Sequence, residues 1–94
     1  MVVQKGCAII MNLIDFETYL MREERSINTI SCYKRDVSGF FTWYDKEPQQ
    51  INEFDLIAYK RYLLAKEKTV ITANRKLASV NAFCRYLYDA RILP

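Results

Sequence analysis

The residues with the clearest chemical potential are two pairs of adjacent cations, each placed in the first turns of a predicted helix. Lys34 and Arg35 form the first pair, and Arg75 and Lys76 form the second. The start of a helix offers free backbone N–H groups and the positive end of the helix dipole, which together attract phosphate oxygens. Cations in the following turns can then reach a DNA groove. We therefore predict that both helix starts bind DNA.

Polar residues beside these cations complete the predicted DNA-binding surface. A threonine stands at each predicted helix start, where its hydroxyl either caps the helix or turns toward a phosphate. Tyr33, beside the first pair, is the tyrosine best placed to contact DNA. Ser79 extends the Arg75 face with a small side chain, which permits either a close approach to DNA or tight helix packing. The predicted set is Thr29, Tyr33, Lys34, Arg35, Thr72, Asn74, Arg75, Lys76 and Ser79.

The sequence offers no pattern from which an active site can be built. It has no histidine, and it lacks both a glycine-rich phosphate loop and a clustered pair of carboxylates. Cys7, Cys32 and Cys84 are odd in number and widely spaced, so neither a zinc site nor a Cys/His nucleophile is expected. We therefore expect a non-catalytic chain with no metal and no cofactor. Reduced thiols and the lack of any membrane-span pattern favour a cytoplasmic protein without a membrane partner.

Composition and periodicity predict an all-α domain of four helices. The 94 residues suffice for one domain, 51% of them are hydrophobic, and only two glycines and two prolines occur. The predicted helices begin at about residues 12, 29, 52 and 72, with Asn12 and Asn52 as caps because an aspartate follows each by three residues. Gly39 inside the second helix indicates close packing against another helix. Residues 12–94 form the expected domain, and residues 1–11 a flexible leader or an added segment.

An internal repeat divides the chain into two similar halves. At a shift of 43 residues, eight positions between 13 and 44 are identical to their counterparts, among them Thr29 and Thr72. This pattern predicts two related helical hairpins. If the hairpins pack about a pseudo-twofold axis, the starts of the second and fourth helices become equivalent.

The net charge of +3 is mild, but its distribution is uneven. Nine of the eleven acidic residues precede residue 56, whereas eight of the fourteen basic residues follow it. The cations could form a one-sided basic surface for nucleic acid, or they could simply solvate the helix faces. The sequence alone leaves both interpretations open.

The order of several motifs resembles the core-binding domain of tyrosine recombinases of the Xer and phage-integrase type. The first half contains Phe16-x-x-Tyr19-Leu20, the run 26–30 (Ser-Ile-Asn-Thr-Ile), the run 33–37 (Tyr-Lys-Arg-Asp-Val) and Phe40. The second half contains Thr72-x-x-Arg75-x-Leu77-x-Ser79-Val80, then Phe83, Tyr86 and Leu87, and closes on Ile92 and Pro94. Leu93-Pro94 stands where the family usually has Asn-Pro, so the sequence does not fix the C-terminal boundary of the domain.

This resemblance implies a four-helix SAM-like bundle of two crossed helical hairpins. It implies that the second and fourth helices lie against double-stranded DNA at the core recombination site, as one jaw of a clamp. The family cleaves DNA with a tyrosine of a separate C-terminal domain, so the implied partners are DNA, the parent's own catalytic domain and other recombinase protomers. Two alternatives remain, which are a helical protein–protein interaction module and a stand-alone helix-turn-helix regulator.

Overall fold

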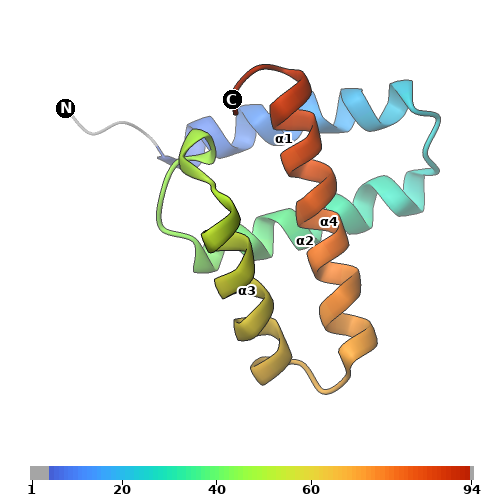
Figure 1. The fold of residues 1–94 in the computed structure, drawn as a ribbon. Coiled ribbons are helices and arrows are strands. Elements are labelled where there is room, and N and C mark those ends of the chain that lie inside the picture. The colour runs from blue at the N-terminus through green and yellow to red at the C-terminus, as the bar shows by residue number, and fades with distance from the viewer. Residues whose placement is uncertain (1–4, 94) are drawn as a thin grey trace.

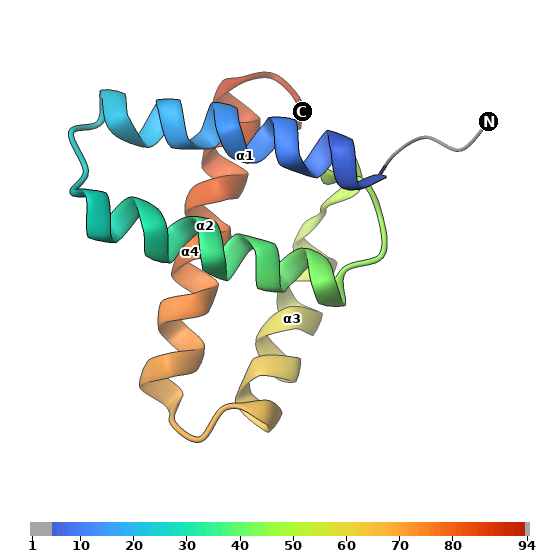
Figure 2. The same ribbon diagram turned by 180° about the vertical axis from the view of Figure 1, so that it is seen from behind.

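In the part of the chain that the structure describes, four α-helices form two antiparallel hairpins that cross. The computed structural model describes the backbone of residues 5–93 and the side chains of residues 12–93. α1 (Lys5–Arg22) and α2 (Ile27–Trp43) form the first hairpin, and α3 (Glu53–Lys66) and α4 (Val70–Asp89) form the second. A short 3-10 turn, η1 (Pro48–Gln50), lies between them. Figure 1 shows the second hairpin lying across the first, and Figure 2 shows the same crossing from behind.

The predicted fold class is confirmed, because no described residue lies in a strand and the helices form a compact bundle. No helix in the described part of the chain is both long and apolar enough to cross a membrane. The third helix begins as predicted, with the Asn52 side chain accepting from the backbone N–H of Asp55 in a capping box. This reciprocal pair satisfies two N–H groups that the helix itself leaves unpaired.

The starts of α2 and α4 correct the predicted caps. Ser26 and Thr69 are the cap residues, and their hydroxyls accept from the backbone N–H groups of Thr29 and Thr72 at 3.1 Å. Thr29 and Thr72 therefore lie one turn inside their helices. Each start offers two hydroxyls three residues apart, and the first takes the cap because it can reach the N–H three residues ahead.

The first helix also begins earlier than predicted. α1 starts at Lys5, so Asn12 lies inside the helix and does not cap it. Residues 5–11 contain no proline, and apolar residues such as Ile9 and Ile10 can continue a helix. Of the predicted leader, residues 5–11 are thus helical, whereas residues 1–4 lie outside the described residues.

The core confirms the pseudo-twofold relation that the repeat predicts. Phe16 of α1 packs edge-on against Phe83 of α4, with ring centroids 5.1 Å apart. At the same shift of 43 residues, Tyr59 of α3 packs edge-on against Phe40 of α2 at 4.8 Å. The first helix of each hairpin therefore packs its rings onto the second helix of the other. Apolar burial across both hairpins holds the crossing together.

Candidate nucleic-acid interface

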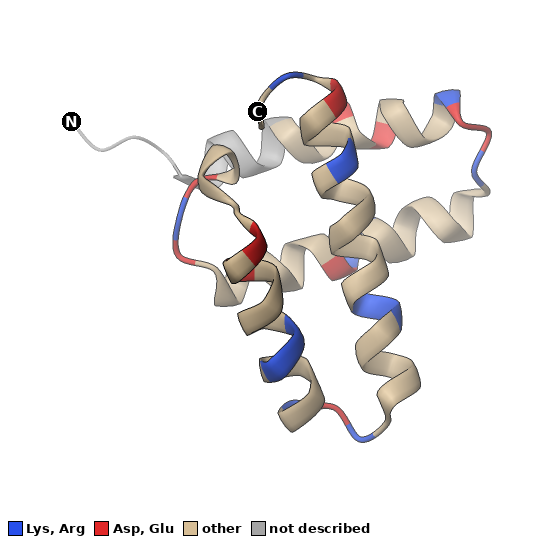
Figure 3. Ribbon diagram, viewed as in Figure 1, with Lys and Arg blue, Asp and Glu red and all other residues tan. Residues whose placement is uncertain are grey.

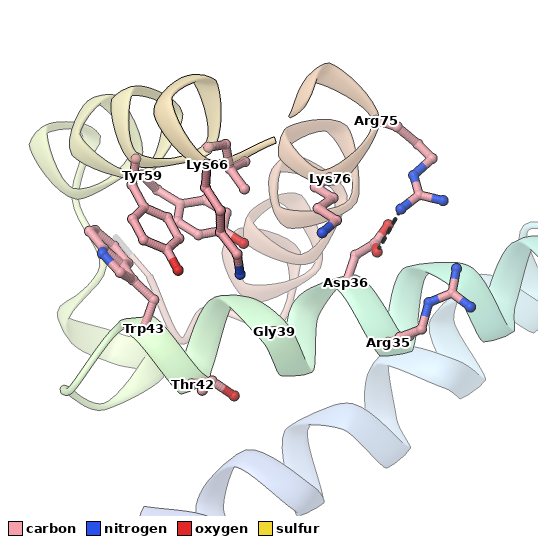
Figure 4. A pocket seen from close by; sticks show the side chains of 11 residues that line it. Arg35, Asp36, Gly39, Thr42, Trp43, Tyr59, Lys66, Arg75 and Lys76 are labelled. Carbon is pink, nitrogen blue, oxygen red and sulfur yellow. Dashed lines mark hydrogen bonds and ion pairs between the residues drawn. The ribbon is translucent and has the colours of Figure 1, made fainter. Parts of the chain in front are cut away.

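A groove enclosed by α2, α3 and α4 gathers cations from all three helices (Figure 4). Its volume is about 660 Å³, which is within the range of ligand-binding clefts. We call it the basic groove, because four of the described residues that line it are cations and only one of them, Asp36, is acidic. Those four cations are Arg35 of α2, Lys66 of α3, and Arg75 and Lys76 of α4.

A buried carboxylate fixes the crossing of α2 and α4 at the edge of this groove. Asp36 is 4% exposed, and it accepts hydrogen bonds from Ser79 Oγ at 2.8 Å and from Arg75 Nη2 at 3.3 Å. Asp36 and Ser79 are counterparts in the repeat, so the pseudo-twofold axis passes between them. A buried charge needs such partners, since an unpaired one would be costly to bury. The same contact holds the guanidinium of Arg75, whose side chain is 48% exposed, at the groove.

Lys76 and Lys34 are also held by carboxylates. Lys76 Nζ lies 2.8 Å from Glu67 Oε2 in the basic groove, and this hydrogen bond lowers the pKa of Glu67. Lys34 Nζ lies 2.7 Å from Glu17 Oε1 of α1, outside the groove lining. A DNA phosphate that binds either lysine must therefore compete with a carboxylate of the protein.

Aromatic side chains form the wall of the basic groove on the α3 side. The Trp43 ring lies 5.6 Å from that of Tyr62 and 5.1 Å from that of Tyr59. Lys66 Nζ lies 5.5 Å from the centre of the Tyr62 ring, at cation–π range. Burial, together with the charge of Asp36, raises the pKa of Tyr59 to about 12. Tyr59 therefore stays neutral at physiological pH, and it contributes an uncharged ring to the wall of the groove.

The floor of the basic groove is an exposed stretch of α2 backbone at Gly39. A Cβ built there would meet no atom within 4 Å, so the prediction of close helix packing at Gly39 is wrong. The bare backbone instead leaves room for a ligand to approach α2 closely.

The structure separates the predicted DNA-binding residues into three groups: residues that line the basic groove, residues of α2 and α4 outside its lining, and two residues that are buried or half-buried. Arg35, Arg75 and Lys76 line the basic groove. Thr29, Lys34, Thr72 and Asn74 lie on α2 and α4 but outside its lining. The starts of α2 and α4 lie at different ends of the crossed hairpins (Figure 1). The basic groove therefore brings together cations that lie further along these helices, and it does not bring the two helix starts together.

Two residues of the predicted set are buried or half-buried. Ser79 is 0% exposed and is held by Asp36, so its hydroxyl cannot reach DNA in this structure. Tyr33 is half-buried, and its ring lies parallel to that of Phe16 at 6.4 Å, at the edge of the core.

The predicted DNA-binding set includes neither Lys66 nor the aromatic residues of the groove wall. The available signal was helical spacing, because Tyr59, Tyr62 and Lys66 recur at intervals of three and four residues on one face of α3.

Comparison with known proteins decides the family. Residues 13–91 match the family model described as "Phage integrase, N-terminal SAM-like domain". The chain belongs to this family. Two similar relatives are named tyrosine recombinase XerC. The protein of Thermodesulfovibrio yellowstonii is 30% identical over 64 residues, which are 68% of this chain and 21% of the relative. The protein of Anoxybacillus flavithermus is 29% identical over 83 residues, which are 83% of this chain and 28% of the relative.

The chain thus spans between a fifth and a third of the length of these recombinases. No solved structure shows significant similarity to the chain.

Proposed function

We propose that α1–α4 form the DNA-binding domain of a tyrosine recombinase, which holds the core recombination site while a separate C-terminal domain cleaves the strand. In this proposal the chain itself is not catalytic, and it acts on double-stranded DNA in the cytoplasm as a bacterial or phage-encoded protein. Its partners are DNA, the catalytic domain and other recombinase protomers. The observation that carries the proposal is the basic groove, in which Arg35, Lys66, Arg75 and Lys76 converge in a member of the integrase family.

Electrostatics supports a phosphate backbone as the ligand of the basic groove. Charge colouring shows cations along α3 and α4 and beside the crossing with α2 (Figure 3). Each neutralised phosphate releases counterions, so three to four contacts give a slope of roughly −3 to −4 in a plot of log K against log salt concentration. Non-specific dissociation constants on the order of 10⁻⁴ to 10⁻⁶ M are expected for such a small footprint.

The test is a salt titration of duplex binding, followed by fluorescence anisotropy, with single-site variants. Arg75→Ala and Lys76→Ala are each expected to weaken binding at least fivefold and to reduce the salt slope by about one. Lys60→Ala is the matched control, because Lys60 is an exposed cation of α3 outside the groove. It should change the affinity less than twofold.

A second variant distinguishes a steric effect on DNA binding from the loss of a positive charge. Gly39→Leu removes no cation, but it places a bulky side chain on the groove floor, where the structure leaves open space. We expect it to weaken DNA binding while leaving the fold intact, because glycine costs about 1 kcal/mol inside a helix. Normal binding by Arg75→Ala, Lys76→Ala and Gly39→Leu together would refute the groove as the DNA site.

A further inference from the structure

The aromatic wall of the basic groove needs an explanation beyond phosphate binding, because its uncharged rings do not attract anions. The Tyr62 ring is tilted by 28° from the plane of Trp43 and by 22° from the plane of Tyr59. Tyr59 is 3% exposed and supports the wall from the core, whereas Tyr62 is 36% exposed. Trp43 and Tyr62 thus line the groove with nearly parallel rings. Such rings are the surfaces on which nucleic-acid bases stack.

A cation already lies over one of these rings. Lys66 Nζ is 5.5 Å from the centre of the Tyr62 ring, so this ring face is accessible from the groove. A cation–π contact at an exposed site is weak, and the flexible lysine side chain can move from the ring to a phosphate. A base that stacks on Tyr62 can therefore displace the ammonium group, and Lys66 can then pair with the phosphate of the same strand.

The α2 helix places an aromatic ring, a bare stretch of backbone and a cation in line. Trp43, Gly39 and Arg35 follow one another at intervals of four residues, so they share one helix face over about 12 Å. Figure 4 shows Gly39 between Trp43 and Arg35 along the groove. A nucleotide has the same order of parts. With its base against Trp43, its sugar can lie over Gly39, where no Cβ blocks the approach, and its phosphate can face Arg35.

We propose that the basic groove binds an unpaired nucleotide of a DNA strand, with the base stacked on Trp43 and Tyr62 and the phosphates held by the cations. This inference rests on the proposed function, DNA binding by the groove, and adds which part of the DNA enters it. A paired base does not fit this role, because its neighbours in the duplex cover both of its faces until it leaves the stack. A strand suits the groove better than a free nucleotide, since its successive phosphates match several cations.

The test compares three labelled DNA molecules with the same flanking sequence by fluorescence anisotropy. The first is fully paired, the second has two adjacent thymine–thymine mismatches, and the third has abasic sites in place of all four mismatched thymines. The wild-type chain should bind the mismatched DNA at least about fivefold more tightly than the paired DNA, which is the contribution of one stacked base. The abasic DNA is also flexible but offers no base to stack, so it should bind within about twofold of the paired DNA.

The fluorescence of Trp43, the only tryptophan of the chain, reports on the wall directly. A base stacked on the indole should quench it, so the mismatched DNA should quench Trp43 and the abasic DNA should not. Thymidine monophosphate separates a nucleotide within DNA from a free one. It offers a single phosphate, so it should quench Trp43 only at concentrations at least about tenfold higher. Equal potency of the free nucleotide would overturn the assignment to a DNA strand.

A single-site variant tests the wall itself. Tyr62→Leu keeps an apolar side chain but removes the ring, so the ratio of affinities for mismatched and paired DNA should fall from at least about five to near one. Tyr88→Leu is the matched control, because Tyr88 is 62% exposed on α4 outside the groove lining, and it should keep the wild-type ratio. Circular dichroism verifies the fold of both variants, and the fluorescence comparison uses only the wild-type chain.

Two kinds of failure can be told apart. Equal binding of paired and mismatched DNA by the wild-type chain, or a ratio that Tyr62→Leu leaves unchanged, overturns the proposal for the unpaired nucleotide. Binding of paired DNA that Arg75→Ala and Lys76→Ala leave unchanged counts instead against the proposed function. The first failure is read in the ratio of the two affinities, and the second in the affinity for paired DNA alone.

Discussion

Replacing Asp36 with alanine tests how the two hairpins are locked together. Asp36 is the buried carboxylate that accepts from Ser79 and Arg75 of α4, so its loss removes two hydrogen bonds between α2 and α4. Hydrogen bonds to a charged group contribute about 1.5–3 kcal/mol each when buried, and the Arg75 contact is partly solvent-screened. The Ser79 hydroxyl, which is 0% exposed, would keep only its 3.3 Å contact to the carbonyl of Arg75.

These terms place the expected loss at about 2–4 kcal/mol of the free energy of unfolding. Domains of this size have a total of about 5–15 kcal/mol, so the variant should melt roughly 10–20 °C lower. Urea denaturation followed by circular dichroism measures the loss. Asp15→Ala, which removes an exposed aspartate of α1, is the control and should cost less than 1 kcal/mol.

A double-mutant cycle makes this prediction specific to the contact. Ser79→Ala alone should cost about 1 kcal/mol, and the cycle with Asp36→Ala should show a coupling energy of about 0.5–3 kcal/mol. If Asp36→Ala costs less than 0.5 kcal/mol, or if the two changes are additive, the carboxylate does not lock the crossing and our reading of the interface is refuted.

Two further predictions concern the basic groove. Glu67→Gln should strengthen DNA binding about two- to fivefold, because it frees Lys76 from a competing carboxylate at 2.8 Å. Glu17→Gln changes the net charge by the same amount outside the groove, so it should strengthen binding less. Equal effects of the two variants in duplex titrations would contradict this prediction. Stability should fall above pH 10. Tyr59 ionises near 10 when unfolded and near 12 when folded, so its contribution is complete below pH 10 and lost as the pH rises through 12. Urea denaturation at pH 8 to 11.5 checks this, and a flat profile would contradict it.

Periodicity and repetition predicted most of the fold. Composition and periodicity predicted the four helices, and the shift of 43 residues anticipated the pseudo-twofold core. The helix ends were harder, because local chemistry offered two equivalent hydroxyls at the starts of α2 and α4. The start of α1 was also missed, since an Asn-x-x-Asp pair inside a helix looks the same in sequence as one that caps it.

The candidate site was predictable only in part, because its geometry depends on contacts between distant segments. Arg75 and Lys76 were found from their place in α4. Their partners Asp36 and Glu67 lie 39 and 9 residues away in sequence, and no local pattern reveals those pairings. For the same reason the sequence left Ser79 open between a DNA contact and tight helix packing, whereas the crossing of the hairpins buries it completely.

The central claim is that the cations of the basic groove bind the DNA backbone. The most direct measurement is the change in backbone amide chemical shifts when a DNA duplex is added to the labelled chain. Our account predicts the largest shifts around Arg35 and Gly39 of α2, Lys66 of α3, and Arg75 and Lys76 of α4. Shifts confined to another surface, such as the outer face of α1, with the groove unchanged, would contradict it.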